Sequence, residues 1–223
     1  MEDIKFIKDN AIYSGECGNG MRWYYFEKML YIEGKGDVYP LEMWEGENYE
    51  IGKDVECLVV GEGCDRIESQ LLYFCDNLIR VDLPASFEGV CWHHIPYESY
   101  ENGAFWLVET MDGDLSDISS SEKLQTINVA EGNPKFASED GVLFDKEKKT
   151  LLCFPCGRTG TYTVPQHIQA IGEDSFGDCD RLEELIIPNS VTEIGRFAFV
   201  GVPHITYHGP DHCKDNWGAK SRN

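Results

Sequence analysis

The sequence predicts a right-handed solenoid, in which short coils of chain stack and share one apolar core, with an all-β cap at its N-terminal end. Three observations favour this fold. A block of apolar residues recurs 23 residues further on (188 − 165 = 23). A related block lies 104 residues upstream (168 − 64 = 104). Each of these copies ends a strand-like run with a proline, at Pro84, Pro165 and Pro188. Self-similarity at a fixed offset is the signature of stacked repeats.

The matching positions of the two C-terminal copies are apolar residues and one glycine. They pair Ile168 with Val191, Ile171 with Ile194, Gly172 with Gly195, Phe176 with Phe199, and Leu182 with Ile205. The upstream copy has equivalents at Cys64, Ile67, Leu72, Cys75, Leu78, Val81, Leu83, Pro84, Phe87 and Val90. A weaker copy comprises Ile118, Leu124, Ile127 and Val129. The stretch 93–121 fits the repeat least, and its coil register stays open.

Each copy combines two periodicities. Leu182-x-x-Leu185-x-Ile187 ends in the alternation of a short strand, which the following proline stops. The next apolar residues come at steps of three to five, which suits a turn and one helical turn. One coil cannot bury this set alone, but stacked coils can. We therefore expect a parallel sheet on the concave face and short helical turns on the convex face.

The ends of the chain differ from the repeat. Residues 1–52 are predicted to form the all-β cap, because Trp23-x-Tyr25 and Leu30-x-Ile32 alternate as paired strands do. The array takes residues 53–223. Its C-terminal cap, at about 203–223, is expected to contain a last strand at 205–207 and a short helix at 211–220.

The repeat resembles the BspA-like leucine-rich repeats of bacterial surface proteins. Their pattern is a strand ending in Ile-Pro, followed by Val-x-x-Ile-Gly-x-x-Ala-Phe-x-x-Cys. The last copy matches it at Ile187-Pro188, Val191, Ile194-Gly195 and Ala198-Phe199, with Val202 in place of the cysteine. The copy before it matches at Ile171-Gly172, Phe176 and Cys179, with Ser175 in place of the alanine. The upstream copy departs from the pattern, with Glu68 for the glycine and Leu72 for the phenylalanine.

The resemblance extends over most of residues 15–223. It implies a β-hairpin insertion at about 133–157, where Asp140-Gly141 separates two apolar runs. It also implies an N-terminal β module over 15–36. Relatives of this kind are adhesion or host-protein-binding surface molecules, so the resemblance implies a protein partner.

Composition narrows the function. The chain has 40 acidic and 19 basic residues and a net charge of −21, so its field repels nucleic acid. No apolar run approaches the ~20 residues of a membrane span, and the N-terminus has no secretory pattern. By default the chain is therefore expected to be cytoplasmic, with an export signal outside the given sequence as the alternative, and the resembled family is often at the cell surface or secreted. The nine cysteines are interpreted mainly as reduced core residues, typical of a reducing compartment.

Three groups of residues have the chemistry of metal ligands, but each lacks the setting of a site. The pair Cys153 and Cys156 has neither a second zinc knuckle nor a thioredoxin-type strand and helix beside it. His204, His208 and His212 have helical spacing, but Gly209-Pro210 breaks any helix there. No metal and no cofactor are predicted, and metal binding by the first two groups is left open. The groups are Cys153 with Cys156; His204 with His208, His212 and Cys213; and Cys91 with His93 and His94.

The favoured function is a non-catalytic protein–protein interaction module that binds a polypeptide on the concave sheet face. No serine, histidine and acid recur in a nucleophile motif, so an enzyme is not expected. The alternative is a structural or self-associating scaffold, and the chain is expected to be a monomer or to associate weakly. The predicted face comprises Arg80, Asp82, Thr126, Asn128, Thr161, Thr163, Glu184, Ile186 and Thr206, with Cys57 and Val59 beside them.

Overall fold

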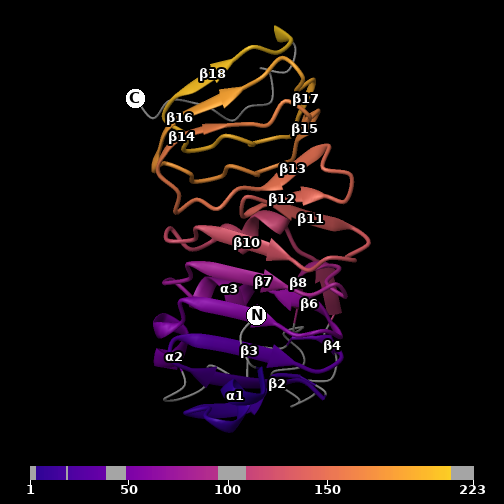
Figure 1. Ribbon diagram of the computed structural model, residues 1–223, viewed down its shortest axis with the longest axis vertical. Coiled ribbons are helices and arrows are strands. Elements are labelled where there is room, and N and C mark those ends of the chain that lie inside the picture. The colour runs from indigo at the N-terminus through magenta and orange to yellow at the C-terminus, as the bar shows by residue number, and fades with distance from the viewer. Residues whose placement is uncertain (1–3, 19, 39–48, 95–108, 212–223) are drawn as a thin grey trace.

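The chain forms a stack of short strands that runs from its N-terminal to its C-terminal elements (Figure 1). The structure is a computed structural model that describes residues 4–18, 20–38, 49–94 and 109–211. Most strand pairs are parallel, and the antiparallel pairs lie at the N-terminal end, in a hairpin within residues 89–112 and in three successive strands within residues 136–153. This is the strand-dominated leucine-rich-repeat type of fold that the sequence predicts. None of the helices in these residues has the length and apolar character of a membrane span.

Two sheets lie on one side of the stack, and we call them the face sheets. The N-terminal face sheet has the order β1 (Tyr13–Glu16), β2 (Arg22–Phe26), β3 (Met29–Glu33), β5 (Cys57–Val60), β7 (Arg80–Leu83), β10 (Thr126–Val129). The C-terminal face sheet has the order β14 (Gly160–Thr163), β16 (Leu182–Ile187), β18 (Ile205–Tyr207).

Most coils turn a corner after the face strand into a second strand. These strands form two side sheets. One has the order β4 (Gly36–Asp37), β6 (Cys64–Glu68), β8 (Gly89–His94), β9 (Glu109–Asp112). The other has the order β11 (Phe136–Glu139), β12 (Val142–Asp145), β13 (Thr150–Cys153), β15 (Ala170–Ile171), β17 (Glu193–Ile194).

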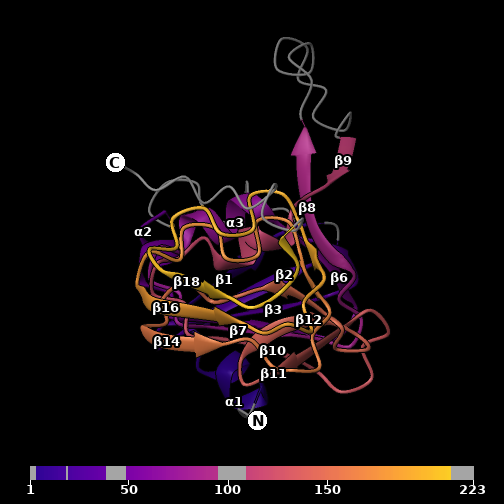
Figure 2. The same cartoon turned by 90° about the horizontal axis from the view of Figure 1, so that it is seen from above.

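Short helices complete several coils. They are α2 (Tyr49–Asp54), α3 (Ser69–Phe74) and the 3₁₀ helix η3 (Leu115–Ser119). Figure 2 shows α2 and α3 across the stack from β14 and β16, which is the arrangement expected of the repeat.

Adjacent repeats are neighbouring rungs, because β14 and β16 pair in parallel with Tyr162 opposite Leu185. The segments that carry Pro165 and Pro188 therefore lie side by side. Most of the apolar residues that define the repeat are buried, including Ile168, Phe176, Leu185, Val191 and Phe199 at 0% exposure, whereas Ile194 and Ile205 are partly buried. The ladder of apolar side chains is thus the core of the stack.

The prediction of one continuous parallel sheet is wrong, because the face is divided between β10 and β14. The hairpin β11–β12, which lies where the insertion was expected, occupies the free edge of β10. Ile127 N donates to Gly141 O (2.9 Å), and Val129 N donates to Ser138 Oγ (2.9 Å). These bonds take the backbone donors that a seventh strand would otherwise use.

The N-terminal region is not all-β as predicted. It begins with α1 (Ile4–Asp9), and the expected boundary at residue 52 falls inside α2. Ile7 of α1 is buried, and Lys8 reaches Glu33 of β3. A single turn of helix has too few apolar positions to show a helical period, so the pattern gave no sign of α1. Strand β3 pairs in parallel with β5, so it continues the face sheet.

The degenerate stretch 93–121 contains an antiparallel hairpin. Strands β8 and β9 pair with Trp92 opposite Met111, and in Figure 2 they extend away from the stack. Residues 95–108 between them lie outside the described residues. Of the predicted C-terminal helix, only Asp211 is described.

The cysteines were expected to be mainly reduced, and one pair departs from this: Cys156 and Cys179 form a disulfide with a Cα–Cα distance of 4.4 Å. They lie 23 residues apart, so the repeat places them at the same position of adjacent coils. Of the other described cysteines, Cys64, Cys75, Cys91 and Cys153 are free thiols. Burial raises the pKa of the Cys75 and Cys153 thiols well above the ordinary range, so these two are unreactive core residues.

The repeat glycine has a steric reason. A Cβ at Gly195 would lie 2.3 Å from Glu173 N and 2.6 Å from Gly172 C, both backbone atoms of the neighbouring rung. The coils approach so closely there that only glycine fits.

We expect Gly195→Ala to lower the free energy of unfolding by about 1–3 kcal/mol, because the rungs must move apart. Urea unfolding followed by circular dichroism measures this loss. Gly172→Ala is the matched comparison and should cost less, since its Cβ would meet Leu151 O at 3.2 Å. An equal cost for both would contradict the close approach.

Candidate binding face and groove

The predicted face residues of the N-terminal face sheet stand in two rows across the strands. Cys57, Arg80 and Thr126 form one row. Val59, Asp82 and Asn128 form the next. These side chains are exposed or half-buried, whereas the alternate residues Leu58, Val81 and Ile127 are at 0% exposure. The register predicted from the alternation is therefore the one in the structure.

The remaining predicted residues lie on the C-terminal face sheet. Thr161 pairs with Glu184, and Thr163 with Ile186, which pairs in turn with Thr206. Thr206 Oγ1 donates to Glu184 Oε1 (2.7 Å). Because the hairpin divides the face, the predicted set forms two surfaces rather than one.

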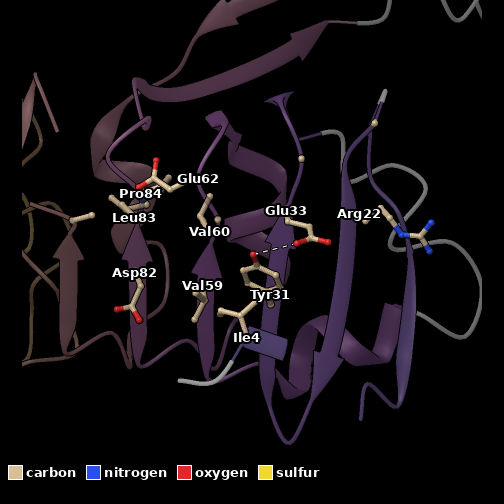
Figure 3. A pocket seen from close by; sticks show the side chains of 14 residues that line it. Ile4, Arg22, Tyr31, Glu33, Val59, Val60, Glu62, Asp82, Leu83 and Pro84 are labelled. Carbon is tan, nitrogen blue, oxygen red and sulfur yellow. Dashed lines mark hydrogen bonds between the residues drawn. The ribbon is translucent and has the colours of Figure 1, made fainter. Parts of the chain in front are cut away.

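A groove of about 750 Å³ lies on the N-terminal face sheet, at the ends of its strands (Figure 3). Its floor includes the Tyr31 ring and Val59, and Ile4 of α1 borders it. Helix α1 lies on the outward side of β2 and β3, since Lys8 bonds to Glu33 and Phe6 packs against Phe26 at 5.6 Å. The other lining residues are Gly20, Arg22, Glu33, Gly34, Val60, Gly61, Glu62, Asp82, Leu83, Pro84 and Ala130.

Two of the three groove carboxylates have a cationic partner within the chain. Asp82 Oδ2 lies 3.2 Å from Arg80 Nε and its Oδ1 accepts from Asn128 Nδ2 (2.7 Å). Glu33 accepts from Lys8 Nζ (2.7 Å) and from the Tyr24 hydroxyl (3.2 Å). These contacts hold both carboxylates in place and balance their charge.

The electrostatics of Glu33 and Tyr31 follow from this packing. Burial by itself would raise the pKa of Glu33, but the hydrogen bond and charge of Lys8 outweigh it and leave the pKa below its ordinary value. Burial and the nearby Glu33 charge raise the pKa of Tyr31 to about 12. Tyr31 is therefore a neutral phenol at physiological pH, and its hydroxyl donates to Glu33 Oε2 (3.3 Å).

Glu62 and Arg22 are the two groove charges without an ionic partner in the described part of the chain. Glu62 is exposed and accepts only backbone amides, from Ala85 N (2.8 Å) and Ser86 N (3.2 Å). Arg22 is exposed on β2. Figure 3 shows Arg22 on one side of Tyr31 and Glu62 on the other. The groove thus has a positive and a negative end.

Sequence reasoning missed Arg22, Tyr31, Glu33 and Glu62 as site residues. The signal for the first three was present, because inward Trp23 and Ile32 require outward neighbours on β2 and β3. Those strands had been assigned to a cap and not to the face. Glu62 follows β5 and has no strand alternation to mark it.

The sequence-derived metal candidates do not assemble in the described residues. Cys156 is bonded to Cys179 rather than paired with Cys153. His204 and His208 are exposed near β18. His212, Cys213 and the side chains of His93 and His94 lie outside the description. No group of three or more metal-ligating side chains occurs in the ranges that are described.

Residues 152–214 match the family model described as "BspA type Leucine rich repeat region (6 copies)". No curated protein matches.

Several solved structures are similar at low identity. A leucine-rich repeat protein from Eubacterium ventriosum is 15% identical, with 88% of this chain and 72% of that chain covered and a TM-score of 0.39. A leucine rich cell surface protein from Faecalibacterium prausnitzii is 20% identical, with 72% and 44% covered and a TM-score of 0.41. The pneumococcal vaccine antigen PcpA is 16% identical, with 87% and 70% covered and a TM-score of 0.37. At these scores the likenesses carry no argument about function.

The family assignment depends on the repeat itself: its motif, its buried ladder and its match to the family model all coincide between β13 and β18. Residues 152–214 are therefore a BspA-type leucine-rich-repeat region, as the motif predicted.

Proposed function

We propose that this chain is a protein-interaction module that binds an extended polypeptide on the outward side of its face sheets. The proposal takes the stack as a right-handed solenoid with capped ends, whose face sheets form the concave side. The single observation that carries it is the groove, which opens onto the same strands as the in-register rows of polar side chains. That the chain has no catalytic role stays a prediction.

The groove is long enough to hold a short extended peptide. Its lining comes from β2, β3, β5, β7 and the residue after β10, four strand spacings of about 4.8 Å or about 19 Å in all. An extended chain advances about 3.3 Å per residue, so about six residues can cross it. Hydroxyl, amide and charged side chains beside an apolar floor suit backbone and side-chain contacts with a polypeptide.

The experiment is selection of a displayed library of random eight-residue peptides against the full chain, followed by measurement of dissociation constants. We expect binders, and we expect the triple variant Arg80→Ala, Asp82→Ala, Glu184→Ala to weaken them at least about tenfold. Its thermal midpoint should stay near the parent value, since all three side chains lie on the surface. Asp82 borders the groove, whereas Glu184 tests the C-terminal face sheet.

The matched control is a triple alanine variant of Glu88, Lys135 and Glu139. These residues lie on the β11–β12 hairpin and near it, and they also include an ion pair, Lys135 with Glu88 at 3.4 Å. The control should bind as the parent does. Absence of any binder, or equal weakening by both triples, overturns the proposal.

A second candidate function, a self-associating scaffold, is favoured by exposed apolar side chains at the N-terminal end. Phe6, Ile12 and Tyr13 are 53%, 59% and 51% exposed. Tyr13 begins β1, the edge strand of its sheet, and Ile12 directly precedes it, and exposed edges favour strand pairing between chains.

Sedimentation velocity over a hundredfold range of concentration tests the scaffold. Association should raise the mean sedimentation coefficient, and Ile12→Lys should abolish the rise because a charge protects an edge. A concentration-independent monomer removes this candidate.

A further inference from the structure

Within the part of the chain that is described, the groove has an unpaired positive side chain at one end and an unpaired negative side chain at the other. Of its four charged side chains, Glu33 and Asp82 are balanced by Lys8 and Arg80. Arg22 and Glu62 have no ionic partner in the described ranges, and both are exposed. Between them lies the Tyr31 ring, which is 7% exposed and bonded to Glu33.

The strand register places Arg22, and two hydrogen bonds place the Glu62 carboxylate. Arg22 stands opposite Glu33 in the strand register, so it is at the β2 side of the groove. Glu62 is held toward the β7 side by the Ala85 and Ser86 amides, which follow that strand. Both carboxylate oxygens of Glu62 accept one amide each, and each retains lone pairs that can accept a further donor.

We propose that the groove binds an extended segment that has an acidic side chain at the Arg22 end and a basic side chain at the Glu62 end, with apolar residues between them over Tyr31 and Val59. This deepens the proposed function and rests on it. Charge complementarity supports it, since neither Arg22 nor Glu62 forms an ion pair within 4.0 Å in the described chain.

The strand spacing sets the distance between the two charges of the ligand. From β2 to β5 are two spacings, and from β2 to β7 three, which gives about 10–14 Å. An extended segment covers this distance in three or four residues. Because such a segment can lie in either chain direction, the order of acid and base along the peptide is immaterial, but their opposite signs are required.

The experiment uses three synthetic eight-residue peptides with Val-Tyr-Val between two charged residues. The charged residues are Glu and Lys, two Lys, or two Glu. For the unaltered chain, we expect the mixed peptide to bind about tenfold more tightly than either like-charged peptide at low salt. This preference should weaken as salt is raised.

Charge reversal then exchanges the preference. Arg22→Glu should favour the peptide with two Lys, and Glu62→Lys the peptide with two Glu. The double reversal should again favour the mixed peptide. Lys135→Glu, on the hairpin side, changes net charge as Arg22→Glu does and should leave the preference unaltered. Thermal midpoints verify that each variant folds. The neutral variants Arg22→Gln and Glu62→Gln provide the same test, by loss of discrimination at one end, if a reversed charge prevents folding.

The outcomes separate this inference from the proposed function. Equal affinities for the three peptides, or a preference that the reversals leave unchanged, overturn the polarity even if the library yields groove binders. The same holds if the library yields binders but none of the three peptides binds. A library without binders overturns the proposed function itself. Exchange of the preference by both single reversals and its return in the double reversal support the inference.

Discussion

Phe176→Ala is expected to lower the free energy of unfolding by about 3–5 kcal/mol, because it opens a cavity between coils that the neighbouring rungs cannot close. Phe176 is at 0% exposure. Its ring stacks on Phe154 at 4.9 Å and meets Phe199 at 5.7 Å. Three successive coils therefore lose contacts in one substitution.

The measurement is urea unfolding by circular dichroism. With a slope of about 2 kcal/mol per molar urea, the expected loss moves the midpoint by about 2 M. Phe197→Ala is the matched control, since Phe197 lies in the next coil but is 46% exposed and should change stability by about 0.5 kcal/mol or less. Similar small losses for both would mean that the phenylalanine ladder is not a packed core.

The repeat was the part of the fold that sequence could predict best, because burial itself imposes the pattern. Ile168 and Val191, or Phe176 and Phe199, are equivalent since each faces the same core from adjacent rungs. The interruption of the repeat by the β11–β12 hairpin was harder to predict. The face is divided because Gly141 O and Ser138 Oγ accept hydrogen bonds from β10. Bonds of this kind leave no periodic pattern in the sequence.

The sequence predicted which residues of the face strands point outward, but it did not predict the groove beside them. Alternation places Arg80, Asp82 and Asn128 outward, and the structure agrees. The groove, however, is bordered by α1, and its charge pattern depends on which of its charged side chains form ion pairs. Whether Glu62 has a cation beside it is a property of tertiary contacts, and no spacing in the sequence encodes it.

Reduction of the Cys156–Cys179 bond is expected to lower the free energy of unfolding by about 3 kcal/mol. The bond closes a loop of 23 residues, and a loop of that length restricts the unfolded chain by about this amount in the chain-entropy model. It also ties the turn after β13 to the turn after β15, so the loss should fall on the C-terminal coils.

Urea unfolding with and without a phosphine reductant measures the effect, and peptide mapping of the unreduced protein should find Cys156 linked to Cys179. The double variant Cys156→Ala, Cys179→Ala is the control, because its stability should not respond to reductant. A parent protein equally stable in both conditions would show that the bond contributes nothing. Disulfides persist in oxidising compartments and are rare in the cytosol. Recovery of the bond from cells grown without added oxidant would therefore contradict the cytoplasmic location that the sequence alone suggests.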